Sequence, residues 1–279
     1  MAFVTRFAPS PTGPLHLGHA YSALLAHDLA VAARGRFLLR IEDTDIERCR
    51  PEWEAQIYDD LHWLGLRWPE PVLRQSDRVA EYEVVLDSLA ARGLVYPCSC
   101  SRADIRAAVS APQEGVAKPG IYPGTCRHRT MATRLPGDAL RLNMAAAVAA
   151  VALPLRYCDT GSEQPGWHEI SAPGLIARHG DVVLGRKDIG TASYVLAAVL
   201  DDCHQQISDV IRGADLCEIT EVQVLLQHLL GLPTPTYHHH HLIRDAQGKR
   251  LAKRCDARAL SKYRGEGATP AEIRGMVGL

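Results

Sequence analysis

Two stretches far apart in this sequence carry residues that could bind phosphate. His16–His19 reads His-Leu-Gly-His and follows a turn with three prolines and one glycine. A helix that starts there would direct backbone N–H donors and the positive end of its dipole at the turn, with both histidines on that side. Gly248–Arg254 places four cations within six residues after a glycine, which is typical of a loop that closes on a triphosphate. Together the two stretches predict an ATP site.

Each motif alone has a simpler explanation. The first could be a helix start with two surface histidines, and the second could be a solvated basic loop. Their joint occurrence favours the ATP site. We predict His16, His19 and Lys253 as catalytic residues that stabilise developing negative charge, with Gly18 and Arg250 completing the ATP-binding set.

The segments around the first motif predict a strand, a helix and a second strand. The apolar run Phe3–Phe7 is followed by a helical pattern over His16–Arg34 and an apolar run over Arg36–Ile41. Such a unit is a parallel crossover, which places the loop after its first strand at the ligand-binding edge of an open α/β sheet. Two more amphipathic helices are expected at Pro51–Leu64 and Asp77–Arg92.

The remainder of the chain predicts an interrupted nucleotide fold. The segment from Tyr96 to about Arg129 is rich in Pro, Gly and Cys and indicates an insertion. The apolar run Val182–Leu184 and the helical stretch Ala192–Asp202 are expected to complete the sheet. From Gly231 onward we expect a smaller helical part that carries the basic loop. The predicted divisions are residues 1–95 and 166–230 for the two halves of the nucleotide fold, 96–165 for the insertion, and 231–279 for the C-terminal part.

The insertion contains a candidate metal site. Cys98 and Cys100 are followed by Tyr122 and Cys126, so three thiols and a phenol lie in one loop-rich segment. Thiolates favour four-coordinate zinc, and a segment without its own core needs such a staple. Three free thiols remain the alternative, and His128 could replace Tyr122 as the fourth ligand.

Composition indicates a globular protein. The chain has 279 residues, of which 47% are hydrophobic, and a formal net charge of −1, enough for one large or two modest domains. The longest small-apolar stretch, Met144–Leu155, contains Pro154 and is too short to span a bilayer. No charged-then-apolar leader opens the sequence, so we expect a cytoplasmic protein with no membrane segment. The eight cysteines are then reduced thiols or metal ligands rather than disulfides.

These motifs resemble those of the class I aminoacyl-tRNA synthetases. His16–His19 resembles their HIGH signature and Arg250–Arg254 their KMSKS loop, with Ala252 where serine is usual and arginine where the first lysine is usual. Arg6–Ser10, Arg40–Asp45 and Val210–Leu216 resemble the glutamyl branch. The resemblance implies an α/β class I fold with a Rossmann-like parallel sheet, ATP with Mg²⁺, and L-glutamate as substrate. It also implies that Cys98, Cys100, Tyr122 and Cys126 hold structural zinc.

Activation of glutamate needs cations for two carboxylates and an acceptor for the ammonium group. Arg6 and Arg212 supply planar cationic forks, and Glu42 can pair with the ammonium. A surface ion pair or a packed tyrosine would explain any one of these residues alone. By resemblance, the glutamate contacts are Arg6, Phe7, Ala8, Pro9, Ser10, Glu42, Tyr194 and Arg212.

The acceptor is expected to be an RNA. Full-length glutamyl-tRNA synthetases continue well beyond the KMSKS loop into anticodon-reading domains, whereas this sequence ends about 25 residues after Arg254. The closer resemblance is to truncated paralogues that glutamylate queuosine in the anticodon loop of tRNA(Asp). The alternatives are a minimal synthetase that charges a tRNA 3′ end, another adenylyl-transferring enzyme, and a non-catalytic zinc-containing RNA-binding module.

Overall fold

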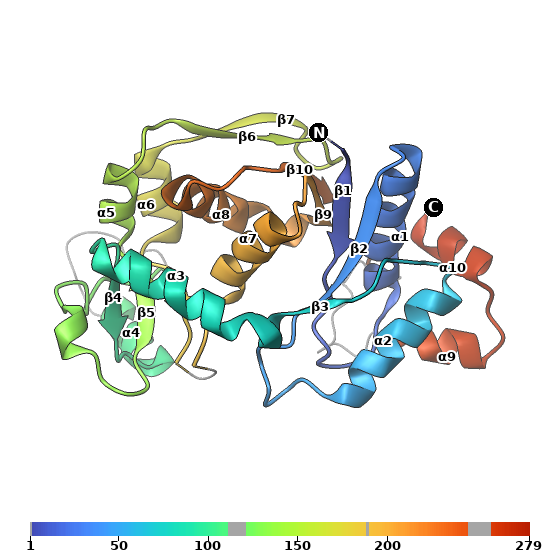
Figure 1. Ribbon diagram of the computed structural model, residues 1–279, viewed down its shortest axis with the longest axis horizontal. Helices are drawn as coiled ribbons and strands as arrows, with labels where there is room; N and C mark the ends of the chain where they lie inside the picture. Colours follow the sequence, from blue (N-terminus) through green and yellow to red (C-terminus); the bar gives the residue numbers. More distant parts are fainter. Residues whose placement is uncertain (1, 111–120, 188–189, 245–257) are drawn as a thin grey trace.

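A parallel strand–helix–strand unit opens the fold, as the sequence predicts. The computed structural model describes residues 2–110, 121–187, 190–244 and 258–279. Strands β1 (Val4–Phe7) and β2 (Arg36–Ile41) pair in parallel and are connected by α1 (Leu17–Ala32) (Figure 1). The expected boundaries agree with the observed ones to within two residues.

Side chains of β2 alternate between two cores. Phe37, Leu39 and Ile41 face the core shared with α1, whereas Leu38 belongs to the larger core on the other face of the sheet. Arg40 shares the face of Leu38, since residues two apart in a strand point the same way. Its side chain is fully buried, so β2 carries a charge into the interior.

The parallel sheet continues with strands from the second half of the chain. β9 (Asp209–Gly213) and β6 (Leu155–Asp159) both pair in parallel with β10 (Thr236–His240). β1 lies beside β9, where Ser208 donates its N–H to the Val4 carbonyl oxygen at 3.0 Å. At the two edges, β3 (Leu73–Arg74) pairs in parallel with β2, and β7 (Gly166–Ile170) pairs antiparallel with β6.

A separate three-stranded antiparallel sheet supports the cysteine-rich segment. It consists of β4 (Val95–Cys98), β5 (Ala139–Leu142) and β8 (Val183–Gly185). The expectation that Val182–Leu184 would complete the parallel sheet is therefore wrong. A short apolar run indicates a strand but carries no information about which strand it pairs with.

The expectation of a helical part from Gly231 onward also needs correction. β10 lies inside the parallel sheet between β9 and β6, and the helices that the structure describes after it are α9 (Leu260–Gly265) and α10 (Pro270–Val277). β10 contains three consecutive histidines, His238–His240, and therefore lacks the apolar alternation that marks a strand in sequence. The predicted boundary between the insertion (96–165) and the second half of the nucleotide fold (166–230) falls within the β6–β7 hairpin, whose two strands pair with each other.

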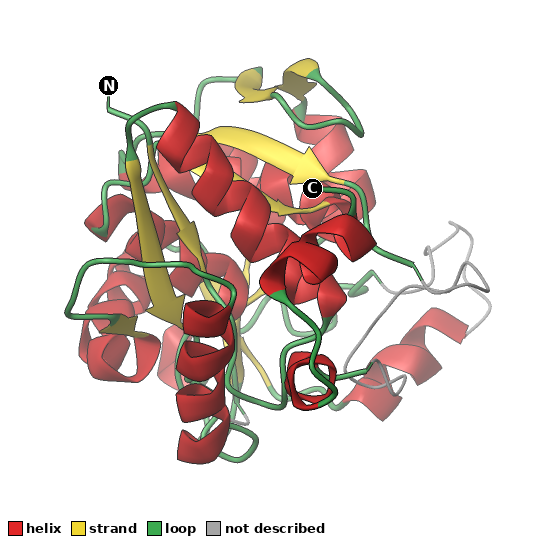
Figure 2. Cartoon of the chain, turned by 90° about the vertical axis from the view of Figure 1, so that its right-hand side faces the viewer, coloured by secondary structure: helices red, strands yellow, loops and turns green. Residues whose placement is uncertain are grey.

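Helices cover both faces of the sheet (Figure 1; Figure 2). One side carries α1, α2 (Pro51–Trp63), α9 (Leu260–Gly265) and α10 (Pro270–Val277), which share a core with Phe37 and Ile41. Among the described residues, no helix has both the length and the apolar character needed to cross a bilayer. Besides α1, the α-helices are α2 (Pro51–Trp63), α3 (Val79–Ala91), α4 (Arg102–Ser110), α5 (Met144–Ala149), α6 (Ala172–His179), α7 (Tyr194–His204), α8 (Cys217–Leu230), α9 (Leu260–Gly265) and α10 (Pro270–Val277), with 3₁₀ turns at Gln75–Arg78, Met131–Thr133 and Ala214–Leu216.

A buried carboxylate lies where α2 meets α9. Asp60 has no exposed side-chain surface, and its Oδ1 lies 3.5 Å from Arg264 Nη2. Burial raises the pKa of Asp60 to about 6, although the Arg264 charge opposes the shift. At neutral pH the folded chain therefore keeps Asp60 ionised at a cost in free energy.

Asp60→Asn should raise the free energy of unfolding by about 1–2 kcal/mol at pH 7.5. A raised folded-state pKa means that wild-type stability falls as the pH rises from about 4, the unfolded value, through about 6. The advantage of the variant should therefore disappear near pH 4. Urea unfolding at both pH values measures it, with exposed Asp87→Asn on the distant helix α3 as the matched control. An equal advantage at both pH values would contradict this account.

Candidate active site

The carboxyl ends of the parallel strands bring the predicted glutamate contacts together. Arg6 lies on β1, Glu42 directly follows β2, and Arg212 lies on β9. The Glu42 N–H donates to the Pro9 carbonyl oxygen at 3.0 Å, which joins the loops after β1 and β2. Tyr194 begins α7, and its hydroxyl accepts from Arg212 Nη1 at 3.4 Å. The other predicted contacts, Phe7, Ala8 and Ser10, lie on the segment that leads from β1 into the turn.

An ion-pair network holds Arg6 and Glu42. Arg6 donates to both carboxylate oxygens of Asp202, through Nε at 2.8 Å and Nη2 at 3.2 Å. Arg40 Nη1 donates to Asp202 Oδ1 at 2.6 Å, and Arg40 Nη2 donates to Glu42 Oε1 at 3.2 Å. Asp202 from α7 therefore orders side chains from both β1 and β2.

The pKa shifts follow from this balance of charge and burial. Burial alone would raise the pKa of Asp202, but Arg6 and Arg40 outweigh it and lower that pKa to about 2. The pKa of Glu42 is raised by burial, although Arg40 and Arg6 act in the opposite direction. Glu42 is consequently an acceptor whose proton affinity depends on the neighbouring arginines.

Arg212 differs from the other two arginines in having a neutral environment. It is buried, and its short hydrogen bonds go to Gln223 Oε1 at 2.7 Å and Thr220 Oγ1 at 2.6 Å. Its Nε donates to His239 Nε2 at 3.1 Å. Among the described residues, no carboxylate forms an ion pair with Arg212. A buried cation surrounded by neutral acceptors is suited to an anionic ligand.

The two histidines of the first motif cap α1. His16 Nδ1 accepts from the Gly18 N–H at 3.1 Å, and His19 Nδ1 accepts from the His16 N–H at 3.1 Å. The ring centroids are 3.8 Å apart. Because a backbone N–H occupies each Nδ1, the neutral rings carry their proton on Nε2. Each imidazole can then donate its Nε2–H to an anion. A Cβ at Gly18 would lie 3.0 Å from the His16 ring, so glycine permits this capping geometry.

The chain on either side of the second motif approaches the first motif. His241 Nδ1 lies 3.3 Å from the hydroxyl of Tyr21 on α1. After the motif, Ala259 forms a β-bridge with His16, and the Leu260 N–H donates to the Leu15 carbonyl oxygen at 2.8 Å. The predicted ATP-binding residues Arg250 and Lys253 lie outside the described residues.

The four predicted metal ligands converge. The sulfur atoms of Cys98, Cys100 and Cys126 all lie within 4.8 Å of one another. The Tyr122 hydroxyl lies 3.4 Å from Cys98 Sγ and 3.6 Å from Cys100 Sγ, and Cys100 Sγ lies 3.6 Å from Cys126 Sγ. Tetrahedral zinc with Zn–S bonds of about 2.3 Å separates its ligand atoms by about 3.8 Å. The donor set and its spacing therefore fit zinc.

Other groups near this cluster affect its charge. Burial opposes ionisation of Cys126, but hydrogen bonds with Tyr122 and Cys100 outweigh it and lower the pKa of Cys126 to about 7. Arg141 Nε lies 3.3 Å from Cys98 Sγ, and its guanidinium lies 3.8 Å from the Tyr122 ring centroid. His128, the alternative ligand, is exposed and is not part of the cluster found among the described residues.

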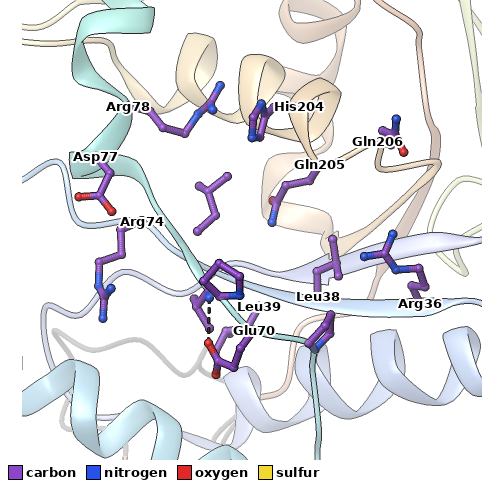
Figure 3. A pocket seen from close by; sticks show the side chains of 14 residues that line it. Arg36, Leu38, Leu39, Glu70, Arg74, Asp77, Arg78, His204, Gln205 and Gln206 are labelled. Atoms are coloured by element: carbon purple, nitrogen blue, oxygen red, sulfur yellow. Dashed lines mark hydrogen bonds between the residues drawn. The ribbon is translucent and has the colours of Figure 1, made fainter.

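A cavity of about 610 Å³ lies along β2 and its edge neighbour β3 (Figure 3). Its lining includes Arg36 at the start of β2, Arg78, and Gln205 and Gln206 after α7. None of the predicted ligand contacts lines it.

Comparison with known proteins identifies the family. A family model described as the catalytic domain of class I tRNA synthetases (E and Q) matches residues 2–136 and 171–279. The chain belongs to this synthetase family. A relative from Rhodobacter capsulatus, named glutamyl-Q tRNA(Asp) synthetase, is 58% identical and covers 99% of this chain and 100% of its own. A relative of the same name from Albidiferax ferrireducens is 41% identical over 92% of this chain and 86% of its own.

Solved structures agree with the family assignment. A glutamate tRNA ligase from Elizabethkingia meningosepticum, in complex with its amino acid, superposes with a TM-score of 0.78 at 27% identity. The match covers 100% of this chain and 61% of that synthetase, so this chain spans less than two thirds of its length. A putative arginyl-tRNA synthetase from Campylobacter jejuni, at 13% identity and a TM-score of 0.52, shares the fold.

Sequence reasoning missed the partners of the predicted arginines. Asp202 and Arg40 tie together Arg6 and Glu42, while His239 contacts Arg212. A detectable signal was present for two of them. Arg40 interrupts an apolar strand, and Asp202 belongs to an acidic pair that ends the apolar run of a helix. Both patterns are compatible with a buried charge. His239 lies in a run of four histidines, where nothing local distinguishes it.

Proposed function

We propose that this synthetase activates L-glutamate with ATP and transfers the glutamyl group to queuosine in tRNA(Asp). The observation that carries the proposal is Arg212, a buried cation with neutral hydrogen-bond partners at the same sheet edge as Arg6 and Glu42. The relatives named glutamyl-Q tRNA(Asp) synthetase support the choice of acceptor.

The pocket supplies complementary charges for glutamate. Arg212 binds one substrate carboxylate, since its contacts with Tyr194 and the Leu216 carbonyl oxygen are long, at 3.4 Å, and leave those N–H groups available to a stronger acceptor. Arg6 already makes a bidentate pair with Asp202 and keeps Nη1 for a second acceptor. Glu42 accepts from the substrate ammonium.

Activation takes place between this pocket and α1. An oxygen of the substrate α-carboxylate attacks the α-phosphorus of ATP in line, the bond to pyrophosphate breaks, and glutamyl-adenylate forms. The Nε2–H donors of His16 and His19 stabilise the added negative charge, and Lys253 contributes a cation. Magnesium bound with ATP would neutralise part of the phosphate charge.

Transfer needs no nucleophile from the protein. A hydroxyl of the RNA acceptor attacks the activated carbonyl carbon of the adenylate. The new ester bond forms, the hydroxyl proton is released, and AMP leaves. Because both ATP and tRNA are cytoplasmic substrates, we place this reaction in the cytoplasm.

A direct assay tests the proposed function. The protein is incubated with ATP, labelled glutamate and tRNA(Asp), either containing or lacking queuosine, and the labelled nucleotide is mapped. Label is expected only in queuosine-containing tRNA(Asp), in the anticodon loop. Label at a 3′-terminal adenosine would identify ordinary charging and contradict the proposal. Absence of glutamate-dependent pyrophosphate exchange would instead identify a non-catalytic module.

We also propose that zinc is bound by Cys98, Cys100, Tyr122 and Cys126 as a structural ion. The support is the convergence of three sulfur atoms and one phenol oxygen at tetrahedral spacing. Zinc would replace the weak contacts among these groups by coordinate bonds and hold the loop of Cys126 against β4.

Loss of this ion should destabilise the cysteine-rich segment. Cys126→Ser should abolish stoichiometric zinc, measured by elemental analysis, and make the segment between β4 and β5 sensitive to protease, because structural zinc sites supply folding free energy. Chelation of the wild-type protein should produce the same cleavage pattern. Cys158→Ser, a half-buried cysteine of β6 outside the cluster, is the matched control. Retention of zinc by Cys126→Ser would contradict the assignment.

A further inference from the structure

Three adjacent strands place a carboxylate, an imidazole and the Arg212 guanidinium in one line. His239 on β10 is the register partner of Arg212 on β9, and Asp159 ends the neighbouring strand β6. His239 Nε2 lies 3.1 Å from Arg212 Nε, and His239 Nδ1 lies 2.5 Å from Asp159 Oδ2. The His239 side chain is fully buried and that of Asp159 is 2% exposed.

The hydrogen bonds determine the tautomer of His239. His239 Nε2 has two neighbours, Arg212 Nε at 3.1 Å and the Thr220 hydroxyl at 3.2 Å. A guanidinium has only donors, so the Arg212 Nε–H directed at Nε2 favours an unprotonated Nε2, and the Thr220 hydroxyl is compatible with that form because it can itself donate. The ring is therefore neutral with its proton on Nδ1, which donates to Asp159. Burial and the Arg212 charge lower the pKa of His239, although Asp159 opposes that shift. A neutral His239 ring can therefore accept from Arg212 and donate to Asp159 at the same time.

Asp159 is itself held rigidly. Its Oδ1 accepts from the Gly161 N–H at 2.8 Å and from the His239 N–H at 3.2 Å. A Cβ at Gly161 would lie 2.1 Å from the His239 carbonyl oxygen, so the loop after β6 packs directly on the backbone of β10. The carboxylate thus has donors on both oxygens and little freedom to rotate.

The same groups could be considered as a metal site, because Cys217 lies near Asp159 and His239. The geometry argues against that reading. His239 Nε2 faces a guanidinium and Nδ1 is bound to Asp159, so neither ring nitrogen is available to a cation without displacing an existing partner.

We propose that Asp159 and His239 form a positioning pair that fixes the plane of the Arg212 guanidinium for the glutamate carboxylate. Asp159 fixes the tautomer of His239, and His239 offers an acceptor to Arg212 Nε. The two terminal nitrogens of Arg212 then keep a constant orientation towards Gln223 and the substrate. No proton is transferred in this arrangement. This inference rests on the proposed role of Arg212 in glutamate binding.

Two substitutions interrupt the pair at different points. Asp159→Asn removes the fixed acceptor for Nδ1–H and allows the tautomer with Nε2–H directed at Arg212. His239→Leu removes the acceptor altogether. In glutamate-dependent pyrophosphate exchange, each should raise the KM for glutamate by about 10- to 100-fold, the range expected for one hydrogen bond to a charged group. The KM for ATP should stay within about twofold of the wild-type value, and His239→Gln, which can still accept through its amide oxygen, should retain more glutamate affinity than His239→Leu.

His238→Gln is the matched control. His238 lies on the same strand, but its Nδ1 pairs with the Thr160 hydroxyl at 3.1 Å, and residues adjacent in a strand point to opposite faces. The His238→Gln variant should keep the wild-type KM for glutamate and for ATP. The positioning role would be overturned if Asp159→Asn and His239→Leu raised the KM for glutamate and the KM for ATP equally. It would also be overturned if neither variant raised the KM for glutamate.

Nitrogen-15 NMR of the histidine rings tests the pair without activity. Wild-type His239 should show the neutral Nδ1–H tautomer, and Asp159→Asn should shift signal towards the Nε2–H form. A wild-type Nε2–H tautomer would overturn the inference even if the variants fold poorly. Should the wild-type protein catalyse no glutamate-dependent exchange, the proposed function fails, and the NMR result then decides the Asp159–His239–Arg212 arrangement by itself.

Discussion

Replacing Asp202 with alanine should lower the free energy of unfolding by about 3–5 kcal/mol, the cost of leaving a buried charge without its partner. Here two guanidiniums, those of Arg6 and Arg40, lose the carboxylate that both contact. Urea unfolding at pH 7 measures the change. Asp28→Ala is the matched control, because Asp28 pairs with Arg274 at the surface and such pairs contribute about 0–1 kcal/mol. Similar effects of the two substitutions would contradict the role assigned to Asp202.

Acid should reduce the difference between wild type and Asp202→Ala. The folded-state pKa of Asp202 is lowered to about 2, so its stabilising contribution is present above the unfolded value of about 4 and is lost as the pH falls towards 2. The difference in unfolding free energy between wild type and Asp202→Ala should therefore be smaller at pH 3 than at pH 7. A constant difference would indicate that the variant acts through packing rather than charge.

Arg212→Lys should lower kcat/KM for glutamate in pyrophosphate exchange by about 100- to 1,000-fold, within the 2–5 kcal/mol typical of a broken buried charge contact. Lysine keeps the charge, but it cannot reproduce the fork that contacts Gln223, Thr220 and His239 together. The loss should fall on glutamate, with the KM for ATP little changed.

Arg156→Lys is the matched control for Arg212→Lys. Arg156 pairs with Glu169 on the exposed face of the β6–β7 hairpin, with both side chains more than half exposed, so the substitution should leave exchange kinetics unaltered. An Arg212→Lys enzyme with wild-type glutamate kinetics would remove the observation on which the proposed function depends.

Much of the fold is encoded locally and was predictable. Turn residues and apolar periodicity mark β1, α1 and β2, and the observed crossover is parallel as expected. The thiols of Cys98, Cys100 and Cys126 were identified by their spacing, and the structure brings them together. Strand partners were less predictable. β8 has the expected apolar run but pairs in the antiparallel sheet, and β10 was missed because histidines obscure its alternation.

The sequence alone determined the types of residues at the substrate edge: two imidazoles at a helix start, and arginines and a glutamate at strand ends. Only the tertiary structure decided how those charges are balanced. Arg6 is paired with Asp202 from 196 residues away, whereas Arg212 meets a neutral ring on the adjacent strand. The physical reason is that periodicity and turn chemistry act over a few residues, while the electrostatic environment of a buried group is set by whichever distant strand or helix packs against it.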